Sequence, residues 1–286
     1  MFRNIMLTVA YQGTRYCGWQ VQPDAPTVQE FVETAVKKLT GTDTRVLCSS
    51  RTDSGVHALG QVASFRTESK IPGGQFRRGL QRYLPDDISI VNSQEVSADF
   101  HATYSAIRKR YRYLIFDGAI LPPFLRHQVF RHRSELDVAA MQQSLPHLLG
   151  THDFRCFETN YPNKATSVRT IMEATLTRVP HWSMWTTDHE WMSANARPHQ
   201  DPHLPLICFE IMADGFLYNM VRAIVGTLVQ VGSGKKPPRH IAEVIGSRDR
   251  ASAGTTAPAN GLFLVKVDYP SELLVPDEVS EDPDGA

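Results

Sequence analysis

Residues 50 to 58 read Ser-Arg-Thr-Asp-Ser-Gly-Val-His-Ala, and this stretch predicts an extended segment that ends in a turn carrying one acid and one cation. Arg51 and Asp53 are two positions apart, so in extended backbone their side chains point the same way. Ser54-Gly55 then offers a turn at little steric cost. A lone Arg-x-Asp is usually a surface ion pair at a structural turn, so a functional interpretation needs support from the rest of the chain.

Hydrophobic periodicity predicts the elements around this turn. Strands are expected near residues 5–12, 44–50, 60–66, 87–97, 109–116, 127–132, 169–178, 205–212 and 262–268. Helices are expected from Val28 to Gly41, over 74–83, from Asp137 to Gly150 with a break at Pro146, and over 215–231 and 238–246. Thr27 and Glu30 form a capping-box pattern at the start of the first helix. Strands and helices that do not alternate strictly favour an α+β fold with antiparallel sheet.

The length of 286 residues suggests two domains. We expect an N-terminal α+β domain over 1–105, which carries Asp53, and a second α+β domain over 106–270. Residues 180–204 are rich in His, Trp, Pro and Asp and suggest a long surface insertion in the second domain. Residues 271–286 are acidic and contain Pro, which predicts a disordered tail.

The zero net charge of the chain conceals an asymmetry. All 30 Lys and Arg lie within residues 1–266, whereas seven of the 30 Asp and Glu follow residue 266, which leaves a net charge of +7 on 1–266. Residues 101–133 hold seven cations against one acid, Asp117, with aromatic residues between them. Basic and aromatic residues together suit phosphate contact and base stacking. The competing interpretation is a solvated, salt-bridged strand face, and the local excess of +6 favours nucleic acid.

Other features restrict the class of protein. The four cysteines form no C-x-x-C pair, which argues against a structural zinc site and a disulfide scaffold. The sequence has no apolar run of membrane-spanning length and begins without the layout of a signal peptide. We therefore expect a cytoplasmic protein with no membrane partner.

Several motifs together resemble the TruA family of tRNA pseudouridine synthases. Residues 51–58 resemble the family signature R-T-D-x-G-V-H-A. Five further stretches resemble family motifs and follow in family order: Phe100-His101-Ala102, Arg110 to Tyr113, Ser167 to Ile171, Phe216 to Arg222 with Ile224 to Gly226, and Ala257-Pro258 with Gly261-Leu262. Such a set is far more specific than any one motif. The resemblance implies two related ferredoxin-like α/β sandwich domains that share a largely antiparallel sheet, with an active-site cleft between them.

The resemblance also implies a reaction and its residues. Uridine becomes pseudouridine when the N1–C1′ bond breaks and a C5–C1′ bond forms, which requires no metal and no cofactor. Asp53 is the candidate nucleophile, Arg222 is the cation expected beside it, and Tyr111 is expected to stack on the uracil near C5. Whether the carboxylate attacks C1′ or C6, or the reaction begins by elimination at the sugar, stays open.

The resemblance further implies tRNA as the partner, a homodimer that holds one tRNA, and targets at positions 38 to 40 of the anticodon stem-loop. The target base must be flipped out, and Arg51 matches the residue proposed to fill its place. The other candidates for RNA contact are Phe100, His101, Lys109, Arg110, Arg126, Arg131 and Arg169. Thr103 stands where the family usually has Arg, which puts one RNA contact in doubt, and Gln81 stands where the family usually has Asn.

Two other functions compete with this one. A non-catalytic RNA-binding module would keep the basic and aromatic residues and would need neither Asp53 nor Arg222. A metal-dependent hydrolase would need ligands from a scattered set that has no ligand spacing: His147, His152, Asp153, His181 and His189. A phosphate-binding loop at Gly232 to Lys236 fails on spacing, since no Gly precedes its Gly-Lys by five residues.

Overall fold

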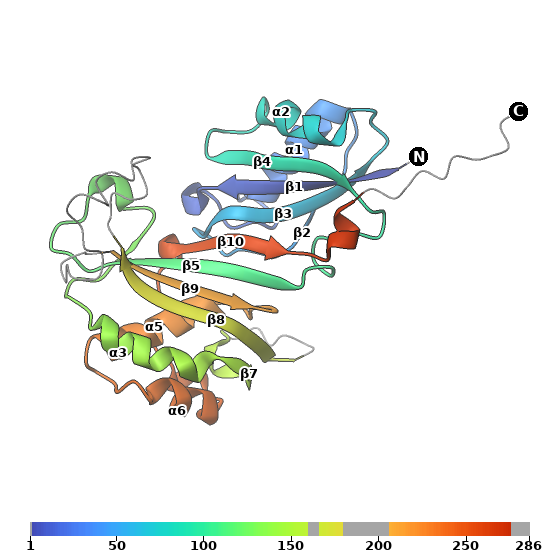
Figure 1. The fold of residues 1–286 in the computed structure, drawn as a ribbon. Helices are drawn as coiled ribbons and strands as arrows, with labels where there is room; N and C mark the ends of the chain where they lie inside the picture. Colours follow the sequence, from blue (N-terminus) through green and yellow to red (C-terminus); the bar gives the residue numbers. More distant parts are fainter. Residues whose placement is uncertain (1, 160–165, 180–205, 276–286) are drawn as a thin grey trace, which may run out of the picture. The chain divides into compact units, whose positions relative to one another are not determined.

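The computed structural model describes residues 2–159, 166–179 and 206–275 and divides into two compact units (Figure 1). Unit 1 comprises Met1–Arg108 and Val265–Ala286, and unit 2 comprises Lys109–Leu264. The boundary between the units runs through β10 (Leu262–Asp268). Residues 106–108 and 265–270 therefore belong to unit 1, whereas the sequence analysis assigned them to the second domain. The expected insertion at 180–204 lies outside the described residues.

Unit 1 is built on antiparallel strands around β1. The strands are β1 (Arg3–Tyr11), β2 (Leu47–Cys48), β3 (His57–Thr67) and β4 (Ile88–Val96). Ile5 of β1 lies opposite Phe65 of β3 on one side and Glu95 of β4 on the other. The strand expected over 44–50 is reduced to the two residues of β2, which pair with Ser64 and Ala63 of β3.

Two helices accompany these strands in unit 1, α1 (Val28–Thr40) and α2 (Phe76–Gln81), the second preceded by the 3₁₀-helix η2 (Gly73–Gln75). Val28, Val32 and Val36 of α1 are fully buried, and each contributes roughly 1.5–3 kcal/mol of hydrophobic stabilisation. Helix α1 ends as predicted at Gly41, whose φ is +77°.

The predicted capping box at the start of α1 does not form, because Thr27 makes no side-chain capping hydrogen bond. The amides of Val28 and Gln29 donate instead to the carbonyls of Gly18 and Trp19, at 3.2 and 3.0 Å. These partners are distant in sequence, so the local pattern could not reveal them.

In the described part of unit 2, antiparallel strands follow the order β5 (Arg108–Phe116), β9 (Leu206–Ala213), β8 (Val168–Val179) and β7 (Gly150–Asp153). The short β6 (Phe130–Arg131) pairs with β5 in parallel. Strand β7 was not predicted; it begins at Gly150, the residue at which the preceding helix was expected to stop.

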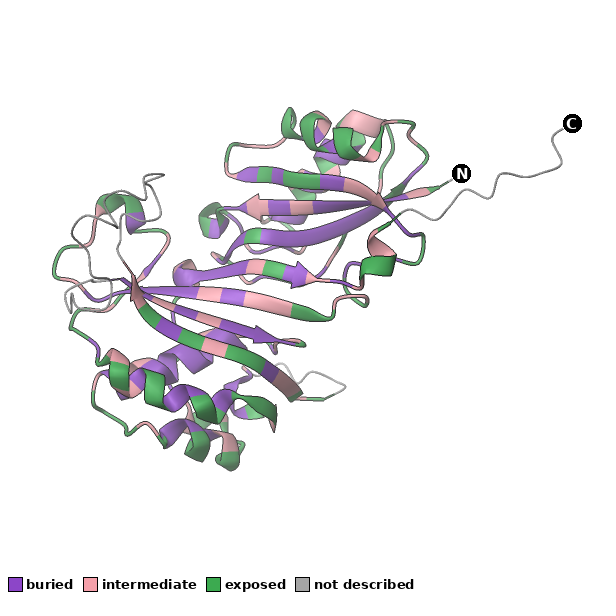
Figure 2. Cartoon of the chain, viewed as in Figure 1, coloured by how far each residue is buried: buried purple, intermediate pink, exposed green. Residues whose placement is uncertain are grey.

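Among the described residues of unit 2, the helices are α3 (Val138–Ser144), α5 (Met220–Gly232) and α6 (His240–Ser247), which lie together in Figure 1. Pro146 shortens α3 as predicted, since the chain continues as the 3₁₀-helix η4 (Leu145–Leu148). Helix α5 begins at Met220, five residues later than expected, after Asn219 in a left-handed conformation. Buried residues cover most of α5, which is drawn largely in the buried colour in Figure 2.

The two units confirm the predicted α+β fold class with mostly antiparallel strands. The expected disorder from residue 271 is wrong for the first residues, because Ser271–Leu274 form a 3₁₀-helix, η8, in unit 1. The carbonyls of Leu273 and Leu274 accept hydrogen bonds from the Ser97 amide and the Gln94 side chain. Among the described residues, no helix is both long and apolar enough to cross a membrane.

Candidate active site

Asp53 lies at the start of a tight turn in unit 1 that is closed by backbone groups. The amide of Val56 donates to the Asp53 carbonyl at 3.1 Å, and Gly55 between them has a φ of +78°. Thr52 is buried, with its hydroxyl 2.7 Å from that of Tyr11, whereas Arg51 is exposed and Asp53 is half-buried. The buried Thr52 between two more accessible neighbours agrees with the predicted common direction of Arg51 and Asp53.

The segment 13–19 wraps closely around residues 53–56, which we call the Asp53 turn. A Cβ on Gly13 would lie 1.9 Å from the Val56 carbonyl oxygen, and one on Gly18 would lie 2.4 Å from the Thr52 oxygen. The Tyr16 carbonyl accepts the Gly55 amide at 3.3 Å, and the Trp19 amide donates to Thr52. The sequence reasoning missed this wrap, although Gly13 and Gly18 on either side of Tyr16 were a signal of close backbone approach.

The Tyr16 hydroxyl donates a hydrogen bond to the Asp87 carboxylate, which also accepts one from Arg15 at 2.7 Å. Burial and the hydrogen bond to Asp87 raise the pKa of Tyr16 to about 12. Burial alone would raise the pKa of Asp87, but the hydrogen bonds from Arg15 and Tyr16 outweigh it and lower that pKa. Asp87 therefore anchors the wrap as a structural carboxylate.

In unit 2, Arg222 on α5 is half-buried and bound by two uncharged acceptors. Its Nε donates to the Ala257 carbonyl at 2.8 Å, and a terminal nitrogen donates to the Asn219 side-chain oxygen at 2.7 Å. The Ala257 amide in turn donates to the Arg222 carbonyl at 3.1 Å. Asn219 has a φ of +61°, a conformation that Asn tolerates better than most residues. These two contacts orient the guanidinium group within unit 2.

Strand β5 carries two tyrosines that differ in their surroundings. Tyr113 is fully buried, and its hydroxyl donates to the Pro258 carbonyl at 2.6 Å. Burial raises the pKa of Tyr113, and the charge of Arg222 opposes part of this rise. Tyr111 is 6% exposed, and its ring meets Phe216 edge-on with centroids 5.0 Å apart. Burial and this hydrogen bond therefore hold Tyr113 in the core of unit 2.

The segment after α6 joins these groups into what we call the Arg222 cluster, comprising Arg222, Asn219, Tyr113, Ala257 and Pro258. A Cβ on Gly261, in the 3₁₀-helix η7 (Ala259–Gly261), would lie 2.7 Å from the Tyr113 ring. A Cβ on Gly226 of α5 would lie 1.7 Å from the Thr255 carbonyl oxygen. The motif Ala257-Pro258-x-x-Gly261 therefore packs directly on Tyr113 and Arg222.

The sequence predicts that the cations of the basic segment 101–133 contact nucleic acid, but those in β5 form ion pairs with acidic side chains. Arg110 is paired with Glu173 of β8 at 2.5 Å and with Glu210 of β9 at 3.4 Å, and Arg112 is paired with Glu210 at 2.6 Å. Within unit 1, Arg108 is paired with Asp268. The β5 part is accordingly a salt-bridged strand face, the interpretation that the sequence had disfavoured.

The cations beyond β5 are more accessible. Arg126, Arg131 and Arg133 are exposed and make no ion pair with a described residue, and Arg131 donates to the Ala119 carbonyl at 3.0 Å. Lys109 is half-buried. Arg169, also half-buried, donates to the carbonyls of Thr166 and Val168.

Phe100 and His101 have different environments in unit 1. Phe100 is 4% exposed, and its ring lies against that of Tyr269 with centroids 4.8 Å apart. His101 accepts the amides of Thr103 and Tyr104 through Nδ1 and stacks on the Tyr104 ring, which is 85% exposed. Thr103, at the family's Arg position, donates to the Cys48 carbonyl at 2.6 Å.

Among the described residues, no three His, Cys, Asp or Glu side chains are grouped so that they could hold a metal ion. Of the ligands that the hydrolase interpretation needs, Asp153 is paired with Arg155 at 2.8 Å. His181 and His189 lie outside the described residues.

Comparison with known proteins adds independent information. The family model described as tRNA pseudouridine synthase matches residues 7–105 and 145–270. A tRNA pseudouridine synthase A of Acetivibrio thermocellus is 48% identical over 267 residues, covering 93% of this chain and 100% of the relative. Relatives from Thermoanaerobacter sp. and Clostridium perfringens, the latter named tRNA pseudouridine synthase A 2, are 41% and 44% identical with the same coverage.

Proposed function

This chain belongs to the tRNA pseudouridine synthase family and is an isomerase that converts uridine to pseudouridine in tRNA, and we propose that Asp53 is its nucleophile. The observation that carries the proposal is the half-buried carboxylate of Asp53 in a turn that backbone hydrogen bonds hold in place. A reacting group must be held within a fraction of an ångström of its productive position. The wrap of residues 13–19 supplies that constraint through backbone contacts.

The chemistry explains why one carboxylate is enough. The N1–C1′ bond breaks, the base turns, a C5–C1′ bond forms, and the C5 proton is lost while N1 regains one. A carboxylate can carry the sugar or the base through this exchange as an ester intermediate, or act as a base in an elimination. We propose that Tyr111 holds the uracil and stands near C5, and that Arg222 serves the same reaction as a cation.

Contacts with RNA are divided among accessible residues. We propose that Arg51 fills the place of the flipped base and that Arg126, Arg131 and Arg169 contact phosphate, with His101 and Lys109 as further contacts. The ion pairs of Arg110 make it a weaker candidate than these. We also propose the anticodon stem-loop, at positions 38 to 40, as the target, and a homodimer as the acting form, because both are implied by the family resemblance.

The test of Asp53 replaces it with Asn and measures tritium release from tRNA labelled at C5 of uridine. We expect Asp53→Asn to lose activity on the order of 10⁴-fold or more, as loss of a nucleophile does, while tRNA binding persists. Asp86→Asn, which removes an exposed carboxylate from the same unit, is the charge-matched control and should retain activity. Substantial release by Asp53→Asn would favour the non-catalytic RNA-binding interpretation of this turn. Mapping pseudouridine in tRNA from cells that lack the protein would test the target positions.

A further inference from the structure

The helices of unit 1 carry a basic surface that none of the motifs includes. Residues 69–85 hold four cations and no acid. Arg77, Arg78 and Arg82 are exposed and make no ion pair with a described residue. This differs from β5, where Arg110 and Arg112 are paired with carboxylates of neighbouring strands.

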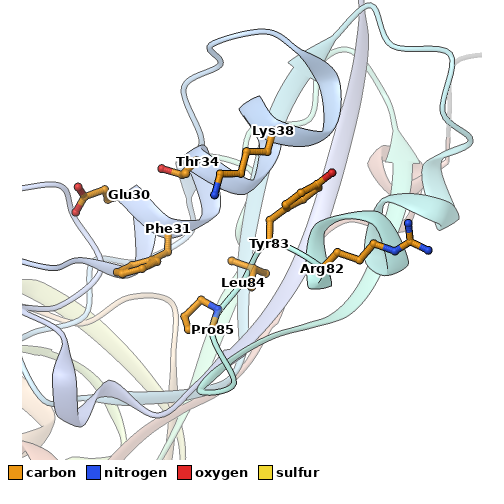
Figure 3. A pocket seen from close by; sticks show the side chains of 8 residues that line it. All are labelled: Glu30, Phe31, Thr34, Lys38, Arg82, Tyr83, Leu84 and Pro85. Atoms are coloured by element: carbon orange, nitrogen blue, oxygen red, sulfur yellow. The ribbon is translucent and has the colours of Figure 1, made fainter.

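A groove runs between α1 and the segment that follows α2. One cavity of about 440 Å³ has Glu30, Phe31, Thr34 and Lys38 of α1 on one side and residues 82–85 on the other (Figure 3). A second cavity of about 580 Å³ is lined by Leu39 and by the three arginines. Arg82 lines both cavities, so we treat them as one basic groove.

The basic groove lies where α2 packs closely on the end of α1. A Cβ on Gly79 of α2 would lie 2.7 Å from a methyl group of Leu39, so α2 approaches the end of α1 closely. The ammonium group of Lys38 lies 5.9 Å from the centre of the Tyr83 ring, within the range of a cation–π contact. Tyr83 remains 41% exposed. The groove thus combines cations with an accessible aromatic ring.

The charge in this groove is unbalanced. Arg78 and Arg82 are four residues apart, a spacing at which like charges on a helix repel. The helix dipole favours a cation near the C-terminal end of α2, which accounts for Arg82 but not for Lys38 on another helix or for Arg77 in the first turn. Glu30 is the acid among the residues of the first cavity. Such a site is stabilised when an anion lies between the cations.

We propose that this basic groove binds the sugar–phosphate backbone of the tRNA substrate, through Lys38, Arg77, Arg78 and Arg82. Phosphate oxygens match the guanidinium groups, and Tyr83 offers a face for a base or ribose. The proposal rests on tRNA as the substrate. Phe31, which lines the groove, also contacts the ring of Tyr16 with centroids 5.7 Å apart, and Tyr16 holds the Asp53 turn.

The test compares two double variants with the same change in charge. Lys38→Gln with Arg82→Gln removes two cations from the groove. Lys37→Gln with Arg45→Gln removes two neighbouring cations that are paired with Asp43 and Glu33. Each variant is titrated with unmodified tRNA between 50 and 300 mM salt, and kcat is measured at saturating tRNA.

We expect the groove variant to bind tRNA about tenfold more weakly at 0.15 M salt and its salt slope to flatten by about one to two units, with kcat unchanged. The control should bind within about twofold of wild type. Equal binding by both variants would overturn the proposal. The proposal would also be overturned if the groove bound a synthetic peptide with the acidic sequence of residues 275–286 but did not bind tRNA. Neither failure bears on Asp53, whose role is tested by turnover of the Asn variant alone.

Discussion

The Asp53 turn of unit 1 and the Arg222 cluster of unit 2 are positioned by different means. The turn is held by backbone hydrogen bonds and by glycines that allow segment 13–19 to touch it. The cluster is held by side chains that reach backbone carbonyls, as Arg222 reaches Ala257 and Tyr113 reaches Pro258. The turn can therefore be tested by adding an atom at a glycine, and the polar contacts of the cluster by removing the side-chain atoms that make them.

The largest expected effect is that of Gly13→Ala. The new Cβ would lie 1.9 Å from a backbone oxygen that cannot rotate away, so the wrap and the turn must separate. We expect a loss of about 3 kcal/mol or more in the free energy of unfolding, together with loss of activity. Urea unfolding followed by tryptophan fluorescence measures the first, and tritium release measures the second.

The matched control is Gly74→Ala in the same unit, because the nearest atom to its Cβ is 3.9 Å away. It should change the free energy of unfolding by less than about 0.5 kcal/mol. A Gly13→Ala variant with wild-type stability and activity would show that the backbone wrap does not position Asp53.

The second effect concerns Arg222. Arg222→Ala removes a charge and two oriented hydrogen bonds, and we expect kcat to fall about 10²-fold with tRNA affinity nearly unchanged. Arg222→Lys keeps the charge but lacks the planar fork that reaches both acceptors, so it should rescue only part of kcat. Asn219→Gly keeps the left-handed backbone, removes one acceptor, and should cost about fivefold. Wild-type kcat in Arg222→Ala would place the required cation elsewhere.

Much of the fold was predictable because its signals are local. The strands around Ile5 and Phe209 and the stop of α1 at Gly41 follow from periodicity and from a glycine with positive φ. The failures involve distant partners. Carbonyls of Gly18 and Trp19 accept the first amides of α1 in place of the predicted capping box. Glu173 and Glu210 form ion pairs with Arg110 and Arg112, but both acids lie outside segment 101–133, in which the charges were counted. The groove cations were missed because they belong to no motif.

A third, smaller effect separates the two tyrosines of β5. Tyr113→Phe leaves the Pro258 carbonyl without its donor and should lower the free energy of unfolding by about 1–3 kcal/mol while kcat stays near wild type. Tyr111→Phe should do the reverse, with stability retained and kcat reduced. Unfolding by urea and tritium release on both variants provide the comparison. An exchange of these two results would make Tyr113 the tyrosine that serves the reaction.

The smallest effect is a pH dependence of stability that Tyr16 contributes to unit 1. Its pKa is about 12 in the folded protein, against about 10 in an unfolded chain, because the buried phenol donates to Asp87. Its contribution to stability is therefore complete below pH 10 and is lost as the pH rises from 10 towards 12. Tyr16→Phe should make the fall in urea midpoint between pH 10 and 12 less steep, while Tyr104→Phe, at an 85% exposed site, should leave it unchanged. Equal slopes in the wild type and Tyr16→Phe would mean that the contact between Tyr16 and Asp87 does not help to hold the wrap around the Asp53 turn.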